Sequence, residues 1–306
     1  MEHSFKNKKF AIVVSLFCMI LWGSAVPLIK STYAILQIGA DDIGGKMLVA
    51  GIRFFFAGLL GLAYFLLLDR EKAHVKNLTW HYVLVLSLLQ TSIQYLFYYV
   101  GLSHTMGVKA SIIQASNAFF VVILSALILK NDRITSQRVL SLLIGTAGIL
   151  VVNFQAGSEM SFHWNGEGAI LAATIFNALA TVYVRKNGQN QNPALATGLQ
   201  FLVGSLPLIA IGWVIRGQFL TLNLKAVLML LYGAFVSATA FTLWSMVLKH
   251  QNSGEFGVYK LFIPIFGSVF SVLILKEAFT MNLLIGMILV LTGSLILNRK
   301  PRKVQP

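Results

Sequence analysis

Ten long apolar runs constrain this chain more than any other feature of its sequence. Each run is roughly 20 residues long, the length that an α-helix needs to cross a hydrocarbon core about 30 Å thick. Backbone inside lipid must satisfy its own hydrogen bonds, so only helix bundles and closed barrels can span a membrane. Runs of this length predict helices, because barrel strands are shorter and alternate in polarity. We expect spans at residues 11–34, 46–68, 80–102, 108–129, 138–155, 166–184, 195–215, 225–248, 256–275 and 280–298.

The composition also indicates an all-α integral membrane protein. Of the 306 residues, 57% are hydrophobic and 11% are charged, which leaves too little polar surface for a soluble domain of this size. The formal net charge of +14 does not predict a nucleic-acid partner, because Lys and Arg are scattered in short clusters between the runs. The single cysteine, Cys18, excludes an internal disulfide and a Cys-based metal site. The first run continues through Ile29 without a cleavage site, so we interpret it as a retained helix.

Basic residues predict the orientation in the membrane, because cytoplasmic loops of membrane proteins are enriched in Lys and Arg. With the N-terminus in the cytoplasm, sixteen Lys and Arg residues fall on the cytoplasmic side and five fall on the other side. The five are Lys46, Lys109, Arg216, Lys225 and Lys276. This bias predicts an even number of spans. We therefore expect an integral protein of the bacterial cytoplasmic (inner) membrane with both termini in the cytoplasm.

The two halves of the chain match when one is shifted by 146 residues along the other. The shift pairs the LILK segment at 127–130 with LILK at 273–276, and it aligns His104 with His250. Five spans per half is an odd number, so the second copy would enter the membrane from the opposite face. Inverted repeats of this kind carry solute sites near the midplane between the repeats. We predict two inverted five-helix repeats, at residues 1–155 and 156–306.

Several short motifs occur one after another along the chain. They are Trp22-Gly23-Ser24, Arg53-Phe54, Pro264, Glu277, and the pair Gly286 and Gly293. Together they make nearly the whole chain resemble the drug/metabolite transporter superfamily, specifically its ten-helix EamA-type members. The first half departs from the pattern, with Ala118 in place of a proline, Asp132 one position late and Ser141 in place of a glycine. We therefore expect the fourth helix to be straighter than the ninth. The resemblance implies efflux of an amino acid, another small metabolite or a drug.

Polar side chains inside the runs indicate which helix faces avoid lipid. Two runs carry them in stripes at spacings of three or four residues: Gln90, Gln94 and Tyr98 in one, and Ser111, Gln114 and Asn117 in the other. The 146-residue shift pairs Gln114 with Lys260 and Tyr98 with Trp244. We predict that these positions line one central cavity between the repeats. The alternative is that the amides only join neighbouring helices by hydrogen bonds.

Two cations lie within the runs and suggest the chemistry of the solute. Arg53 lies roughly 10 Å below the end of its helix, at about 1.5 Å per residue, and Lys260 lies one turn inside the ninth run. Pro264, four residues after Lys260, is expected to kink that helix and expose backbone near the ammonium. No acidic residue lies deep in a run, so these cations favour a solute with a carboxylate. Two structural alternatives stay open: Arg53 as a cap for carbonyls of another helix, and Lys260 snorkelling to the interface.

Other residues complete the expectations. We assign Lys30 to snorkelling and add Trp22, Ser24 and Tyr259 to the predicted substrate site. Small residues are expected to allow close helix contacts; they are Ala57, Gly58, Gly61, Gly145, Gly148, Gly286 and Gly293.

The sequence argues against catalysis. All six histidines fall in loops or at the ends of runs, no two have metal-ligand spacing, and no Ser-His-Asp set or Gly-rich phosphate loop is present. We predict no enzyme activity, no catalytic residue, no metal and no cofactor. The expected partners are a small-molecule solute and membrane lipid, and a homodimer stays open. Two alternative functions remain at this point: a non-transporting membrane receptor or scaffold, and a proton-coupled exporter of drugs or cations.

Overall fold

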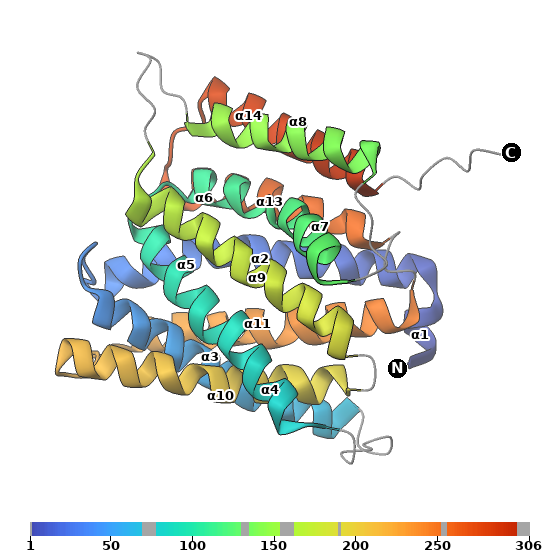
Figure 1. The fold of residues 1–306 in the computed structure, drawn as a ribbon. Coiled ribbons are helices and arrows are strands. Elements are labelled where there is room, and N and C mark those ends of the chain that lie inside the picture. The colour runs from blue at the N-terminus through green and yellow to red at the C-terminus, as the bar shows by residue number, and fades with distance from the viewer. Residues whose placement is uncertain are drawn as a thin grey trace, which may run out of the picture.

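The computed structural model describes residues 2–68, 78–129, 135–153, 162–188, 191–251 and 256–298. Within these ranges the regular elements are helices, and no strand occurs (Figure 1). Eight helical segments are long and apolar enough to cross a membrane, and two shorter apolar helices follow them at Tyr259–Leu275 and Met281–Leu297. The prediction of an all-α protein is confirmed. Asp132 lies outside the described residues.

The helices coincide with the apolar runs. The first half contains α1 (Glu2–Lys6), α2 (Lys8–Ile35), α3 (Ile43–Leu68), then α4 (Trp80–Leu86), η3 (Ser87–Ile93) and α5 (Gln94–Ser103) in one segment, α6 (Gly107–Gln114), α7 (Asn117–Ile128) and α8 (Ser136–Asn153). The second half contains η4 (Trp164–Gly168), α9 (Ala169–Asn187), α10 (Pro193–Arg216), α11 (Leu224–His250), η5 (Gly257–Leu261), α13 (Phe262–Leu275) and α14 (Met281–Asn298).

Asparagine side chains begin three of the long helices. The Oδ1 atom of Asn7 accepts from the backbone amide of Lys9 at 3.0 Å before α2, and that of Asn223 accepts from the Ala226 amide at 2.8 Å before α11. Asn192 caps α10 in the same way, directly before a proline at the first helical position. These caps satisfy amides that have no partner within the helix.

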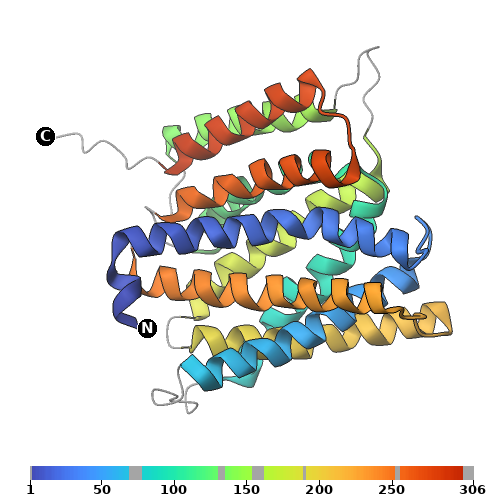
Figure 2. The ribbon, with the colours of Figure 1, turned by 180° about the vertical axis from the view of Figure 1, so that it is seen from behind.

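The helices pack in pairs that cross between the two halves of the chain. α3 lies along α10, and α8 lies along α14 at the edge of the bundle in both views (Figures 1 and 2). α2 packs on α11 and α13, while α9 packs on α5 and α7. α3 also packs on α11, α10 packs on η3, and α6 packs on α13.

Glycines bring several of these pairs into close contact, as the sequence predicts. A Cβ atom on Gly148 would lie 2.8 Å from the carbonyl oxygen of Gly286, and a Cβ on Gly58 would lie 2.7 Å from the backbone nitrogen of Leu202. Ser141, which replaces the expected glycine, donates from Oγ to the carbonyl of Gly293 at 2.7 Å. The substitution therefore replaces a close glycine contact with a hydrogen bond between α8 and α14.

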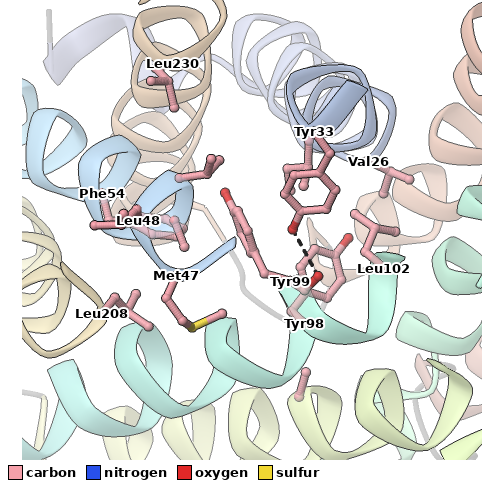
Figure 3. Packing of buried hydrophobic residues seen from close by; sticks show 14 of the residues in the cluster. Val26, Tyr33, Met47, Leu48, Phe54, Tyr98, Tyr99, Leu102, Leu208 and Leu230 are labelled. Carbon is pink, nitrogen blue, oxygen red and sulfur yellow. Dashed lines mark hydrogen bonds between the residues drawn. The ribbon is translucent and has the colours of Figure 1, made fainter. Parts of the chain in front are cut away.

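Buried side chains from both halves of the chain meet in the interior (Figure 3). Tyr33 of α2, Phe54 of α3 and Tyr99 of α5 belong to this cluster, as do Leu208 of α10 and Leu230 of α11. The hydroxyl of Tyr33 donates to the carbonyl of Tyr99 at 2.9 Å, so the polar tip of this buried ring is satisfied. Many large apolar residues lie on the outside instead; they include Leu67, Leu127, Val214 and Leu224. Lipid can solvate such a surface, whereas water cannot do so without cost.

Candidate functional site

Lys260 and Trp244 form the charged part of the predicted site. The Nζ atom of Lys260 lies 5.6 Å from the centroid of the Trp244 ring, a cation–π distance. The Lys260 side chain is exposed, although protein atoms crowd around it. Among the described residues it has no hydrogen-bond or ion-pair partner, so the three N–H donors of the ammonium stay available.

Aromatic rings surround this pair. Trp22 of α2 packs edge-on against Trp244 at 6.1 Å and against Phe241 at 5.3 Å. Tyr259 precedes Lys260 and packs in the same apolar cluster as Trp22 and Trp244. Ser24 lies elsewhere: its Oγ atom donates to the carbonyl of Leu21 at 2.8 Å and lies 3.1 Å from the hydroxyl of Tyr232. The structure thus brings Trp22, Trp244, Tyr259 and Lys260 together and gives Ser24 different neighbours.

The backbone is irregular next to Lys260. Residues Gly257–Leu261 form the 3-10 segment η5, and the α-helical part begins at Phe262. Pro264 has no N–H and cannot donate to the carbonyl of Lys260, the bond that would continue an α-helix. The expected irregularity at Pro264 therefore takes the form of a 3-10 segment one turn before it.

The fourth helix, which we expected to be straighter than the ninth, is itself interrupted in its middle. α6 and α7 are separated by a turn at Ala115 and Ser116, whose amides donate to the third residue back rather than the fourth, at 3.1 and 3.0 Å. The Oγ atom of Ser116 donates to the carbonyl of Ile113 at 2.6 Å and so competes for the backbone acceptors. A serine interrupts this helix where the sequence has no proline. The shift of 146 residues places the break opposite the junction of η5 and α13.

Amide side chains form a hydrogen-bonded chain across three helices. Asn117 of α7 donates from Nδ2 to Oδ1 of Asn177 at 2.9 Å, and Asn177 donates from Nδ2 to Oε1 of Gln94 at 2.9 Å. Nearby, Tyr98 donates from its hydroxyl to Oε1 of Gln114 at 3.4 Å. The two predicted stripes are thus joined to each other.

One member of the stripes differs from expectation, and one polar residue outside them was missed. Gln90 lies in the π-helical segment η3 and joins neither of these contacts. Asn177 of α9 was missed, because a single asparagine in an apolar run forms no stripe. Its position near the middle of the run at 166–184 was the available signal, since isolated polar side chains in a span need a partner.

Arg53 has protein partners at each of its three nitrogens. It donates from Nε to the carbonyl of Gly233 at 3.0 Å, from one terminal nitrogen to the hydroxyl of Tyr99 at 2.9 Å, and from the other to Oγ of Ser237 at 2.8 Å. The side chain is buried, and its guanidinium lies 5.1 Å from the Phe54 ring centroid. This geometry matches the structural alternative for Arg53, because the guanidinium caps a carbonyl of α11 and ties α3 to α5 and α11.

A charged network closes the opposite end of the bundle, here called the Glu277 end. Glu277 accepts from Nζ of Lys30 at 2.8 Å and from the amides of Gly107 and Val108, the start of α6, at 2.8 and 2.9 Å. Lys30 also donates to the carbonyl of Thr105 at 2.8 Å. The assignment of Lys30 to snorkelling is therefore wrong, because its ammonium is held between two protein acceptors.

The network continues to the start of the segment η4–α9. Thr105 donates from Oγ1 to Glu167 at 2.6 Å, and Lys109 forms an ion pair with the same carboxylate at 2.8 Å. The amide of His163 donates to the second oxygen of Glu167 at 2.8 Å. Four segments of the chain thus meet through two carboxylates at the Glu277 end. No cluster of three or more metal-ligating His, Cys, Asp or Glu residues occurs in the described part of the chain.

Known proteins share both the sequence and the fold of this chain. The sequence pattern of the EamA-like transporter family matches it twice, at residues 9–154 and 164–299. A protein from Bacillus subtilis, the uncharacterized transporter YvbV, is 27% identical over 290 residues, which cover 94% of this chain and 90% of YvbV. A WAT1-related chloroplastic protein of Arabidopsis thaliana is 27% identical over 95% of this chain and 69% of its own length.

Two further similarities are more distant. A Salmonella typhimurium protein named as a probable amino-acid metabolite efflux pump is 22% identical over 92% of either chain. One solved crystal structure of a protein superposes with a TM-score of 0.66 at 18% identity, over 95% of this chain and 96% of the other. At that identity the superposition shows the fold alone.

Proposed function

Because the chain belongs to the EamA-like transporter family, we propose that it exports an amino acid or a related carboxylate-bearing solute by alternating access. Family membership confirms the resemblance inferred from the sequence. It also makes the chain a membrane transporter and not an enzyme. The solute, the direction of transport and the mechanism are the parts proposed here.

Lys260 is the observation that carries the choice of solute. Its ammonium lies over the Trp244 ring, is exposed, and has no acceptor among the described residues. A bound carboxylate would pair with this ammonium through a charge-assisted hydrogen bond, while a cationic solute would be repelled by it. This argument favours an anionic or zwitterionic solute over the alternative of a drug or cation exporter.

The amide chain and Lys260 lie at a similar depth, which supports one site between the two halves. α6 and α13 run antiparallel, with Gly107 against Ser271 and Ser111 against Gly267. Extending this register along the helices brings Asn117 roughly level with residues 260 and 261, so a solute bound at Lys260 would lie at about the depth of the amides.

The packing supports a pair of inverted repeats with ten spans, at residues 1–155 and 156–306. If each helix is replaced by its counterpart in the other half, the contact of α2 with α11 becomes the contact of α9 with α5. The contact of α2 with α13 likewise becomes the contact of α9 with α6 and α7. The pairs α3–α10 and α8–α14 each consist of two counterparts, so the replacement leaves them unchanged. The family pattern, which matches once in each half, points the same way.

The two ends of the bundle suggest which state the structure represents. The Glu277 end is tied across both halves, whereas Lys260 at the other end is exposed. The N-terminal helix α1 lies at the Lys260 end, because Gln251 donates from Nε2 to the carbonyl of Phe5 at 2.7 Å. With the termini in the cytoplasm of a bacterial cell, as the bias of basic residues favours, this is an inward-facing state with a closed external end.

Neither rival function is supported by a specific contact. A static scaffold or receptor has no need for two equivalent halves. A proton-coupled carrier needs a titratable acid in the solute path, yet Glu167 and Glu277 are both held by lysines and backbone amides. Exchange or facilitated diffusion fits this arrangement better than proton coupling.

Binding of labelled amino acids to Lys260→Met tests the proposal. The probes are a panel of radiolabelled amino acids, and the purified protein is reconstituted in nanodiscs. A charge-assisted contact is worth about 1.5–3 kcal/mol, so the substitution should raise the dissociation constant roughly ten- to a hundredfold. Lys225→Met, which neutralises an exposed lysine at the opposite end, is the matched control. Equal affinities in the wild type and both variants would rule out Lys260 as the carboxylate contact.

A further inference from the structure

The amide chain between α5, α7 and α9 has a fixed direction. Asn117 also donates from Nδ2 to the carbonyl of Thr174 at 3.3 Å. A backbone carbonyl can only accept, so the nitrogen of Asn117, and not its oxygen, must face Thr174. Asn177 must then turn its oxygen toward Asn117 and its nitrogen toward Gln94. One backbone acceptor thus sets the orientation of three side-chain amides, which distance alone would leave ambiguous.

The series of hydrogen-bonded amides ends at Gln94, whose Nε2 donor is not used. Oε1 of Gln94 accepts from Asn177, and the Nε2 group of Gln94 has no partner among the described residues. Gln94 as a whole is 2% exposed, yet its Nε2 is not among the fully buried polar atoms that lack a partner in the described residues. This donor therefore borders accessible space and can donate to water or to a solute oxygen that replaces the water.

We propose that Asn177 is a positioning residue of the solute path, which holds Gln94 so that its Nε2 donates to an acceptor oxygen of the solute. This inference rests on the proposed function. Asn177 acts through Gln94 and does not itself touch the solute. The path then has two distinct contacts: Lys260 binds the carboxylate, and Gln94 selects solutes with a second oxygen that accepts hydrogen bonds.

A pair of isosteric amino acids isolates this contact. The side chain of O-methyl-L-serine has an ether oxygen, which only accepts, where L-norvaline has a methylene group. Both probes carry the same carboxylate and ammonium, so their affinity ratio cancels effects on those groups. One neutral hydrogen bond corresponds to roughly two- to tenfold in affinity. We expect tritiated O-methyl-L-serine to bind the wild-type protein in nanodiscs about fivefold more tightly than tritiated L-norvaline.

Asn177→Asp should reverse the orientation of the Gln94 amide at the end of this hydrogen-bonded series. In its ionised form a carboxylate at position 177 can only accept, so it accepts from both Asn117 and Gln94. Gln94 must then turn its Nε2 toward residue 177 and present Oε1 to the solute. The preference for the ether should fall to about one or below. Gln94→Met removes the donor directly and should also give a ratio near one, which covers the case in which Asn177→Asp does not fold.

The control is Asn187→Asp, the same substitution at an exposed position near the end of the same helix. It should leave the ratio at the wild-type value. Equal binding of the two probes by the wild type, or an unchanged ratio in Asn177→Asp, would overturn this inference while leaving the proposed function intact. Failure of both probes to bind the wild type while other amino acids of the panel bind would overturn this inference alone, and failure of the whole panel would overturn the proposed function with it.

Discussion

Neutralising Glu277 is expected to open the external end of the transporter. Glu277→Gln removes the ion pair with Lys30, and it leaves one acceptor oxygen where the carboxylate had two. The backbone amides of Gly107 and Val108 each bond a different oxygen of Glu277, so one of them would face the new NH₂ group. The substitution therefore weakens contacts that join helices from both halves of the chain.

The free energy lost with the ion pair depends on how deeply Lys30 and Glu277 are buried. The side chains of Lys30 and Glu277 are 22% and 10% exposed. Exposed ion pairs contribute about 0–1 kcal/mol and breaking buried ones costs about 3–5 kcal/mol. A half-buried pair lies between these limits, at about 2 kcal/mol. If the outward-facing state lacks these contacts, its population should rise about thirtyfold relative to the inward-facing state.

Cysteine labelling from outside the cell measures this shift. Ser271→Cys places a thiol behind the network, where Ser271 is buried against Gly107, and Cys18→Ala removes the native thiol. A membrane-impermeant maleimide should label it about thirtyfold faster when Glu277→Gln is added. Asp42→Asn is the matched control, since Asp42 pairs with Arg216 at the same end but joins α3 only to its partner α10. The role of Glu277 in closing this end is refuted if Glu277→Gln leaves the labelling rate unchanged, or if Asp42→Asn raises the labelling rate equally.

Three further expectations concern stability and topology. Arg53→Met should lower the free energy of unfolding by at least about 1–3 kcal/mol, the cost of leaving one buried neutral acceptor without its donor; a thermal melt in detergent measures this, and a change below about 1 kcal/mol would show that the guanidinium bonds matter little. Gly286→Val should also lower the melting temperature, because a Cβ there would lie 2.8 Å from the Gly148 carbonyl, whereas Gly39→Val should not, since the space around Gly39 is open. Lys303→Cys should be labelled only from the cytoplasmic side, and labelling from outside would contradict the proposed orientation and the inverted repeat.

The sequence predicted the features that follow from local pattern. Helix positions follow from the apolar runs, and the presence of close helix contacts at Gly148 and at Gly286 follows from small residues at helical spacing. That both polar stripes avoid lipid was expected, although the hydrogen bond between Tyr98 and Gln114 was not. In each case a regular spacing within one run carried the information.

Features that depend on contacts between distant segments were not predicted. Lys30 and Glu277 are 247 residues apart in the chain, and each alone is typical of a side chain that reaches the interface. Asn177 has no stripe partner, so only the folded structure shows that it joins Gln94 to Asn117. The break before α7 rests on the hydroxyl of Ser116 and not on a proline, and many serines in helices cause no break.

The treatment of cations in this bundle supports the assignment of Lys260. Lys30 and Lys109 are paired with carboxylates, Lys46 donates to the carbonyl of Ala40, and Arg53 has three neutral acceptors. Protein groups thus satisfy these four cations, as physical chemistry requires where water is scarce. Lys260 differs from these four, since among the described residues the ring of Trp244 is the contact of its ammonium, and Lys260 is exposed. An open contact of this kind is expected where function requires one, and the partner that would complete it is an anion supplied by the solute.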